Sequence, residues 1–546
     1  MKQLATLARL KDGPVLADGL CVWAEGNKVF AFDNRCPHLG FPMHKGSLKD
    51  GIVTCHWHQW RFDACGGGCL TEGGVDLPSY PVEIRGDEVW VDLRPRGDAG
   101  AARWKLLDEG LRESNSSKIA RAVVALVDSG ASDVEIVKRG ALFGVAFKDE
   151  WASGLTILTA HLNVLATLDL PREDRILALV HGLRAVAGDC ENRPPPVPVE
   201  ALPHAETLEM SRLSGWFRQF VEQRDGQAAK RCILTMIGKG ASPRELADAF
   251  LGALTDHVFL EGGHILDFTE KAFELLDRIG WAHAAPVLAS LVTDLAGASR
   301  SEEDSDWRIP HDLIDLMNNS EAGGGDPAPE ALLSDEPARV LTGLAAARPG
   351  AEVRLAVAAL TRVARFHLRN EFFDWDTVHH AFTYSEAARR FVARATPGVP
   401  RIRALLHGAM DVYLVRFLNM PAAPAPKPRA EEPAADTLTK VHEEVGAKRV
   451  EEAARSAATW FAGGQRPVEL WKRLASAYLL EDHGFHTAQA FEAGLGLSMA
   501  VNDLDPQLPA VAVARYLASH SPTNRTMHQT VWATVRLARG DRLFED

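Results

Sequence analysis

The pattern of apolar and polar positions changes once along the chain, close to residue 94. Between Val15 and Leu93, short stretches rich in Val, Ile, Phe and Trp alternate with turns of Gly, Pro and Asp, which is typical of an antiparallel β domain. Beyond Gly97, the chain is rich in Ala and Leu, and apolar residues recur at helical spacing, for example between Ile119 and Val127. The pattern therefore predicts a multi-domain chain in which a small antiparallel β domain precedes a large all-α domain.

Breaks in the pattern indicate where these domains begin and end. The chain has 546 residues, more than a single hydrophobic core usually serves. We expect a β domain at 1–93, a linker at 94–103, a helical domain at 104–420, a Pro- and Ala-rich linker at 421–436, and a helical segment at 437–546. The last segment is expected to pack on the helical domain.

Charge and composition narrow the partners of this chain. The net charge is -13, from 73 acidic and 60 basic residues, which argues against nucleic acid and anionic membranes as partners. We find no apolar run near the 18 residues of a transmembrane helix, and no apolar signal-peptide core follows Met1. With only seven cysteines, placed unlike a secreted disulfide framework, the sequence predicts a cytoplasmic protein.

Two short motifs in the β domain carry metal-binding chemistry. They are Cys36-Pro37-His38 and Cys55-His56-Trp57-His58, each of which supplies one thiol and one imidazole. A 2Fe-2S cluster with two thiolates on one iron and two imidazoles on the other needs two such loops. Tetrahedral zinc also accepts two Cys and two His, but zinc fingers use a Cys-x-x-Cys knuckle and paired histidines on a helix, and neither occurs here.

These motifs, read as Cys36-Pro37-His38-Leu39-Gly40 and as the run from Cys55 to Asp63, resemble the Rieske domain of ferredoxins and ring-hydroxylating oxygenases. Respiratory Rieske proteins carry an additional cysteine in each loop, where this chain has Phe41 and Trp57, so the resemblance is to the ferredoxin and oxygenase branch. It implies a 2Fe-2S cluster bound by Cys36, His38, Cys55 and His58. A reductase or another electron donor is then the expected partner.

A second pattern lies in the helical part, where four histidines open or lie within apolar, Ala-rich segments. They are His161, His264, His380 and His486. Three acids precede histidines by three or four residues, which places both side chains on one face of a helix: Glu261 before His264, Asp376 before His379 and His380, and Asp482 before His486. Di-iron helical bundles use Glu-x-x-His in this way, whereas a single helical histidine is more often a core or surface residue.

Segments between about residues 140 and 540 resemble the questin oxidase family of helical oxygenases. The similar segments are 151–168, 376–390, 481–493 and 514–523. The resemblance implies a non-haem iron bound by His161, His264, His380 and His486, and the spacing adds Glu261 as a candidate ligand. His257, His379 and His483 each lie beside a proposed ligand and could replace or orient it. The sequence leaves open whether this site binds one metal ion or two.

Two hypotheses of function follow. In the first, the chain is an oxidoreductase: the Rieske cluster relays electrons to the iron, which activates dioxygen on an organic, aromatic or polycyclic substrate, with His264, His380 and His486 as the catalytic ligands. In the second, the chain is a non-enzymatic electron carrier or redox-sensing module whose helices form a protein-interaction scaffold. The absence of a fixed repeat period in the sequence favours the first hypothesis.

Overall fold

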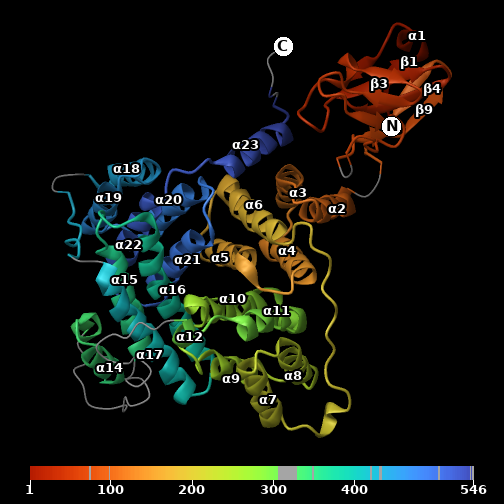
Figure 1. The fold of residues 1–546 in the computed structure, drawn as a ribbon. Helices are drawn as coiled ribbons and strands as arrows, with labels where there is room; N and C mark the ends of the chain where they lie inside the picture. The colour runs from red at the N-terminus through yellow and green to blue at the C-terminus, as the bar shows by residue number, and fades with distance from the viewer. Residues whose placement is uncertain are drawn as a thin grey trace. The chain divides into compact units, whose positions relative to one another are not determined.

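The computed structural model describes residues 1–72, 75–96, 99–304, 329–346, 350–418, 421–429, 433–501, 504–541 and 543. The chain forms two compact units, one made of Met1–Ser132 with Met527–Asp546 and the other of Asp133–Thr526. The first contains all the strands of the described residues, and the second is helical (Figure 1). This confirms the predicted fold class, a small antiparallel β domain followed by a large all-α region.

The β domain contains three small antiparallel sheets. Their strand orders are β1-β10-β9, β2-β3-β4-β8 and β5-β6-β7. The strands are β1 (Lys2–Thr6), β2 (Val15–Ala17), β3 (Leu20–Glu25), β4 (Lys28–Asp33), β5 (Ser47–Lys49), β6 (Ile52–Thr54), β7 (Arg61–Asp63), β8 (Ser79–Tyr80), β9 (Val82–Arg85) and β10 (Glu88–Val91), with the one-turn helix α1 (Leu7–Leu10) after β1.

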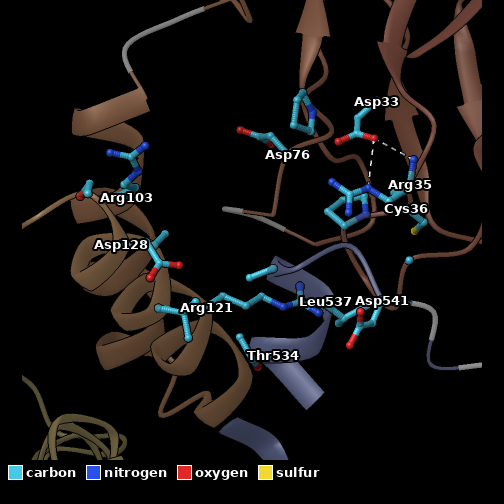
Figure 2. Close-up of a pocket in the computed structure, with 17 residues that line it drawn as sticks. Asp33, Arg35, Cys36, Asp76, Arg103, Arg121, Asp128, Thr534, Leu537 and Asp541 are labelled. Atoms are coloured by element: carbon cyan, nitrogen blue, oxygen red, sulfur yellow. Dashed lines mark hydrogen bonds and ion pairs between the residues drawn. The ribbon is translucent and has the colours of Figure 1, made fainter. Parts of the chain in front are cut away.

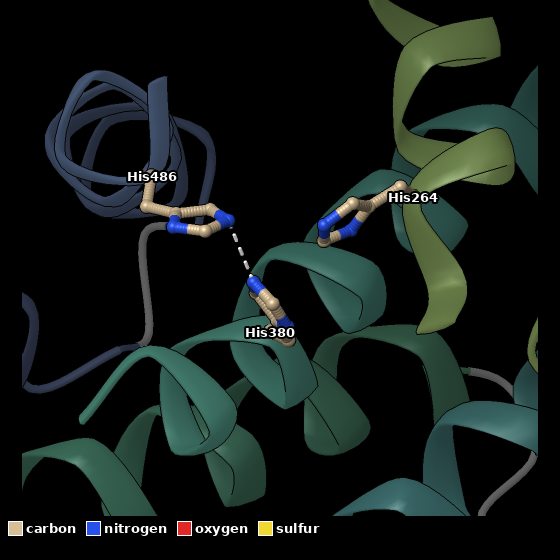
Figure 3. Close-up of side chains that lie close together, drawn as sticks. All are labelled: His264, His380 and His486. Atoms are coloured by element: carbon tan, nitrogen blue, oxygen red, sulfur yellow. Dashed lines mark hydrogen bonds between the residues drawn. The ribbon is translucent and has the colours of Figure 1, made fainter. Parts of the chain in front are cut away.

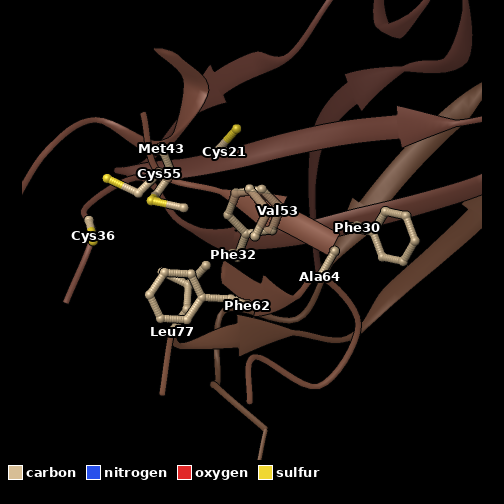
Figure 4. Packing of buried hydrophobic residues seen from close by; sticks show 10 residues of the cluster. All are labelled: Cys21, Phe30, Phe32, Cys36, Met43, Val53, Cys55, Phe62, Ala64 and Leu77. Atoms are coloured by element: carbon tan, nitrogen blue, oxygen red, sulfur yellow. The ribbon is translucent and has the colours of Figure 1, made fainter. Parts of the chain in front are cut away.

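A hydrophobic core holds the two predicted cluster loops together. Phe32 of β4, Val53 of β6 and Phe62 of β7 are fully buried, and Cys36 and Cys55 belong to the same cluster of buried side chains (Figure 4). In β7, Phe62 is buried between the polar residues Arg61 and Asp63, which is the pattern of a strand with one buried face, whereas residues 30–32 of β4 are buried in succession. The packing of the domain therefore brings two loops that are far apart in sequence to one end of the core.

Three longer helices complete the first unit. They are α2 (Ala99–Arg112), α3 (Ser116–Asp128) and α23 (Thr526–Ala538). Helix α2 begins inside the expected linker at 94–103, and α23 groups with the β domain rather than with the helical domain on which we expected it to pack. Helix α23 lies close to the first cluster loop, where a Cβ atom at Gly40 would lie 3.1 Å from Leu537.

The helical unit is formed by many short helices. They are α4 (Asp133–Phe147), α5 (Ala152–Thr167), α6 (Arg172–Asp189), α7 (Met210–Glu222), α8 (Gly226–Gly238), α9 (Pro243–Leu254), α10 (His264–Ile279), α11 (Ala284–Gly297), α12 (Ser301–Asp304), α14 (Pro337–Ala346), α15 (Ala351–Ala364), α16 (Phe372–Arg394), α17 (Val399–Leu414), α18 (Ala434–Gly446), α19 (Val450–Ala462), α20 (Pro467–Leu479), α21 (Phe485–Ala500) and α22 (Gln507–Ser519). None of the described helices is both long and apolar enough to span a bilayer.

Four of these helices, α5, α10, α16 and α21, pack against one another and position the candidate site (Figure 1). Helix α16 is the longest of the described helices and packs against both α10 and α21. Facing helices of this kind can direct side chains from distant parts of a chain into one shared space. The predicted linker at 421–436 partly overlaps α18, and its residues 430–432 lie outside the described residues.

Candidate functional site

The two cluster loops have the same backbone geometry. In the first, the amide of Cys36 donates to the carbonyl of Phe41 and the amide of Gly40 donates back to that of Cys36, both at 2.8 Å. In the second loop, the amide of Cys55 donates to the carbonyl of Trp60 at 2.8 Å, and the amide of Gln59 donates to the carbonyl of Cys55 at 2.9 Å. Each loop therefore closes on its own cysteine and presents a histidine two or three residues later.

The four predicted cluster ligands converge at the tips of these loops. Cys36 and Cys55 are buried, and their thiols are hydrogen-bonded to each other, which lowers the pKa of Cys55 to about 6. The ring centroids of His38 and His58 are 4.8 Å apart. Nδ1 of His38 is buried and has no hydrogen-bond partner among the described residues. Two thiols, two imidazoles and an unpaired buried nitrogen fit the donor set of a Rieske cluster.

Three of the predicted iron ligands also meet, in the helical unit. His264 opens α10, His380 lies within α16, and His486 lies in the first turn of α21, and all three rings face one space (Figure 3). One nitrogen of each lies within 4.8 Å of the others, and the Nε2 atoms of His380 and His486 are 2.8 Å apart. These histidines, which we call the triad, offer three nitrogen ligands in an arrangement suited to a transition metal.

Burial keeps two histidines of the triad available for metal binding. Burial, together with the neighbouring imidazoles, lowers the pKa of His264 to about 4 and that of His380 to about 3. Both side chains are therefore neutral at pH 7, and a metal has no proton to displace from them. The ring of His264 packs at 4.5 Å from that of His380, centroid to centroid.

A carboxylate supports the triad from behind. Asp376, one helical turn before His380, lies 3.6 Å from Nδ1 of His486 and accepts hydrogen bonds from Tyr516 at 2.5 Å and from His520 at 3.1 Å. Burial would raise the pKa of Asp376, but the hydrogen bonds from these three groups outweigh burial and hold it well below its usual range. An ionised carboxylate behind a ligand histidine fixes the orientation of the ring and raises its basicity.

The structure does not bring the other two predicted ligands, His161 and Glu261, to the triad. His161 is buried in α5, where Nδ1 donates to the carbonyl of Ala178 at 2.7 Å and Nε2 accepts from Tyr478 at 2.6 Å. Both of its nitrogens are thus already used. Glu261 is exposed and accepts from the amide of Ser299 at 3.0 Å.

Glu261 misses the triad because the expected helix does not extend that far. Residues Glu261, Gly262 and Gly263 all have positive φ angles, of 49°, 62° and 95°, so α10 begins only at His264. The spacing of three residues then no longer places two side chains on one face. Asp482 likewise precedes α21, which begins at Phe485, and its carboxylate caps the amide of Thr526 at 2.5 Å.

Of the three histidines that could have replaced a ligand, only His379 lies beside the triad, with its ring centroid 6.0 Å from those of His380 and His486. His257 lies 2.5 Å from Glu302 and 2.6 Å from Glu222. The ring of His483 stacks on that of Tyr478 at a centroid distance of 5.7 Å. His379 is fully buried against Tyr516, with centroids 4.7 Å apart, and its nitrogens have no hydrogen-bond partner among the described residues.

Several residues near the triad were not assigned a role from the sequence. Tyr516 and His520 belong to α22 and its C-terminal end, more than 100 residues from Asp376, and only the tertiary fold reveals them. Phe268 and Phe485 flank His264, with ring centroids 5.8 and 5.5 Å away. Both could have been noticed, since Phe268 lies one turn after His264 and Phe485 precedes His486.

Comparison with known proteins concerns the β domain. The family model of the Rieske [2Fe-2S] domain matches residues 4–81. The ferredoxin component of the alkene monooxygenase system of Xanthobacter autotrophicus is 33% identical over 84 residues, which are 15% of this chain and 68% of that protein. The ferredoxin component of the naphthalene 1,2-dioxygenase system of Pseudomonas putida is 33% identical over 97 residues, which are 17% of this chain and 93% of that protein.

Two further similarities involve the same region. The 4beta-methylsterol monooxygenase of Methylococcus capsulatus is 32% identical over 75 residues, 12% of this chain and 20% of that protein. The ferredoxin of Sphingomonas yanoikuyae B1, whose structure is solved, is 28% identical in sequence. The match has a TM-score of 0.16 and covers 17% of this chain and 97% of that ferredoxin. The predicted 2Fe-2S cofactor is supported, while the resemblance to questin oxidases stays a prediction. The N-terminal part of the chain belongs to the Rieske [2Fe-2S] domain family.

Proposed function

We propose that this protein is a Rieske-fused oxygenase in which a cluster bound by Cys36, His38, Cys55 and His58 supplies electrons to a non-haem iron bound by the triad. The observation that carries the proposal is the convergence of His264, His380 and His486 from three helices onto one space, with one nitrogen of each within 4.8 Å of the others. Relatives of the β domain that serve an alkene monooxygenase and a naphthalene dioxygenase support the assignment to oxygen chemistry.

The protein residues have separable tasks in this proposal. Iron with open coordination positions would supply the activation of dioxygen. The triad would hold the metal on three imidazole nitrogens, which leaves coordination positions for other ligands. Asp376 would keep the ring of His486 oriented through its Nδ1 atom. Tyr516 and His520 in turn hold the carboxylate of Asp376 in place.

The surroundings of the triad favour an organic, aromatic substrate. Phe268 and Phe485 flank His264, and their own ring centroids are 6.1 Å apart. Both side chains are partly exposed, as are the three histidines. Aromatic side chains beside a metal give a flat apolar substrate a surface to pack against and keep water from the reacting atoms.

Metal analysis tests the proposal most directly. Anaerobically reconstituted protein should contain more than two irons per chain, and His380→Ala should lose the additional iron while the electron paramagnetic resonance signal of the reduced cluster is unchanged. His283→Ala, a histidine outside the triad, should retain all the iron. The proposal fails if the protein binds only the two cluster irons and no other metal. The carrier or redox-sensing hypothesis would then be the remaining one.

Oxygen consumption distinguishes these two functions further. With a chemical reductant and an aromatic substrate, the wild-type protein should consume dioxygen in a substrate-dependent manner. His380→Ala should lose this activity although its cluster is still reduced. A protein whose oxygen consumption does not respond to any aromatic compound, or is the same in His380→Ala, would contradict the assignment of the triad as the site of the reaction.

A further inference from the structure

Helices outside the Rieske domain cover one of its two cluster loops. A cavity of 440 Å³ separates the first loop from α3 and α23 (Figure 2). The residues that line it include Cys36, Pro37 and Gly40 of the loop, Arg121 and Asp128 of α3, and Leu537 of α23. The second loop is different, because His56, Trp57, His58 and Gln59 are exposed. The two histidines of the cluster site therefore have unequal surroundings.

Arg121 makes the direct contact between α3 and the cluster loop. Its Nη2 atom donates a hydrogen bond to the main-chain carbonyl oxygen of His38. Its guanidinium also interacts electrostatically with Cys36 and with Glu72. Burial lowers the pKa of Arg121, but an arginine side chain stays protonated in proteins. A fixed positive charge thus lies beside two of the four proposed cluster ligands.

The face of α3 that carries Arg121 is held against the β domain. Asn115, Lys118 and Arg121 follow one another at intervals of three residues, so they share one side of the helix. Nδ2 of Asn115 and Nζ of Lys118 each lie 3.4 Å from a carboxylate oxygen of Glu72, and the side chain of Lys118 is only 3% exposed. This arrangement fixes the position of the guanidinium relative to the loop.

We propose that Arg121 is a positioning residue for the Rieske cluster, which holds the His38 loop and raises the reduction potential of the cluster. The inference depends on ligation of the cluster by His38 but not on the oxygenase reaction. Helix α3 is followed within a few residues by α4, the first helix of the unit that contains the triad. Arg121 thus belongs to the last helix of the first unit before the chain enters the second.

The physical basis is the change in charge on reduction. When the cluster takes up one electron, no atom is gained or lost, so its charge becomes more negative by one. A nearby guanidinium stabilises the reduced form more than the oxidised form, and the partly buried setting weakens the screening of this interaction by water. Hydrogen bonds and charges around the ligands are known determinants of the potential of iron–sulfur clusters.

Redox titration of the full-length reconstituted protein, followed by electron paramagnetic resonance, tests the proposal. Arg121→Gln should lower the reduction potential relative to the wild type, and Arg121→Lys should restore much of the difference because it retains the charge. Arg103→Gln is the matched control. Arg103 lines the same cavity from α2 but makes no hydrogen bond to the loop among the described residues, so its loss should shift the potential less.

Two results would overturn the proposal. The first is an unchanged reduction potential in an Arg121→Gln variant with full cluster content. The second is a reduction potential that falls as far in Arg121→Lys as in Arg121→Gln. If Arg121→Gln fails to assemble the cluster, Glu72→Gln is decisive. Removal of a negative charge that faces Arg121 should then raise the potential, and no change or a fall would contradict the proposal. A wild-type protein without a 2Fe-2S signal would refute the ligand assignment as well.

Discussion

Lys271 provides a quantitative test of the packing beneath the triad. Its side chain is 5% exposed, and Nζ lies 2.8 Å from Glu274 and 2.5 Å from Glu492. Arg390 contacts the same two carboxylates at 2.5 and 2.8 Å, so two cations bridge these two carboxylates, and it also contacts Glu386 at 2.8 Å. Burial would lower the pKa of Lys271, but the two glutamates outweigh burial and raise it, so Lys271 is charged at neutral pH.

Replacing Lys271 with Met conserves the length and apolar part of the side chain and removes the charge. Two buried carboxylates then share one cation. Removing one partner of a buried ion pair costs about 3–5 kcal/mol, because the remaining charge stays desolvated. We expect a loss of this size in the free energy of unfolding of Lys271→Met. The additional substitution Glu492→Gln should recover part of it, since it restores equal numbers of opposite charges.

Guanidinium denaturation can distinguish the unfolding transitions of the two units. Far-ultraviolet circular dichroism follows the helical unit, and the visible absorbance of the cluster follows the β domain. Only the helical transition should move to lower denaturant concentration in Lys271→Met. Arg224→Met is the control, because the pair of Arg224 and Glu303 is about 45% exposed on both sides, so its loss should change the stability of the helical unit little. A loss below about 1 kcal/mol in Lys271→Met, or a double variant less stable than the single one, would refute the reasoning.

Three further predictions concern the two metal sites and pH. Asp376→Asn should weaken iron binding at the triad by about 10–100-fold in competition with a chelator, because the carboxylate behind His486 is lost; unchanged affinity would contradict its orienting role. Gly67→Ala should lower the cluster content per chain, since its Cβ would lie 2.0 Å from the carbonyl oxygen of Leu77 at a φ of +84°. Gly51→Ala, at +75° with open space around it, should have less effect. Burial raises the pKa of Asp411 to about 7, so the folded state retains a proton that the unfolded state has lost above about pH 4. The wild-type protein therefore loses stability as pH rises from about 4 to 7, and Asp411→Asn should exceed it in thermal stability by more at pH 8 than at pH 4; an equal difference at both pH values would rule out this ionisation.

The cluster site could be predicted from the sequence because its determinants are local. Each loop closes by hydrogen bonds within six residues, and the motif gives both the ligand types and their spacing. The sequence also placed His264, His380 and His486 together, although each comes from a different helix. It failed for His161, whose segment has the same apolar, Ala-rich character but whose nitrogens bond to Ala178 and Tyr478. Nothing in the local pattern distinguishes a ligand from a core histidine of this kind.

The interactions that support the sites could not be predicted, because they join residues far apart in the chain. The spacing correctly placed Asp376 and His380 on one helix, yet the carboxylate lies beside His486 of α21. The contact of Arg121 with His38 spans 83 positions. Helix periodicity shows which face of a segment is buried, but not which helix covers it. Such pairings depend on tertiary packing, which cannot be derived from the apolar pattern of a single sequence.

The buried charges and the triad occupy the same three helices, and this suggests why so costly a network is retained. Along α10, Lys271 follows His264 by seven residues, and along α16 and α21, Arg390 and Glu492 follow the triad histidines by ten and six. Ion pairs among these residues fix the axial register of the three helices, which apolar packing alone would hold less strictly. A shift of one helix by a single residue would move its histidine by about 1.5 Å, comparable to a metal–nitrogen bond. Lys271→Met should therefore weaken metal binding at the triad even under conditions in which the protein remains folded, whereas Arg224→Met should not. If the two variants bind the metal with equal affinity, the ion pairs do not position the histidines of the triad.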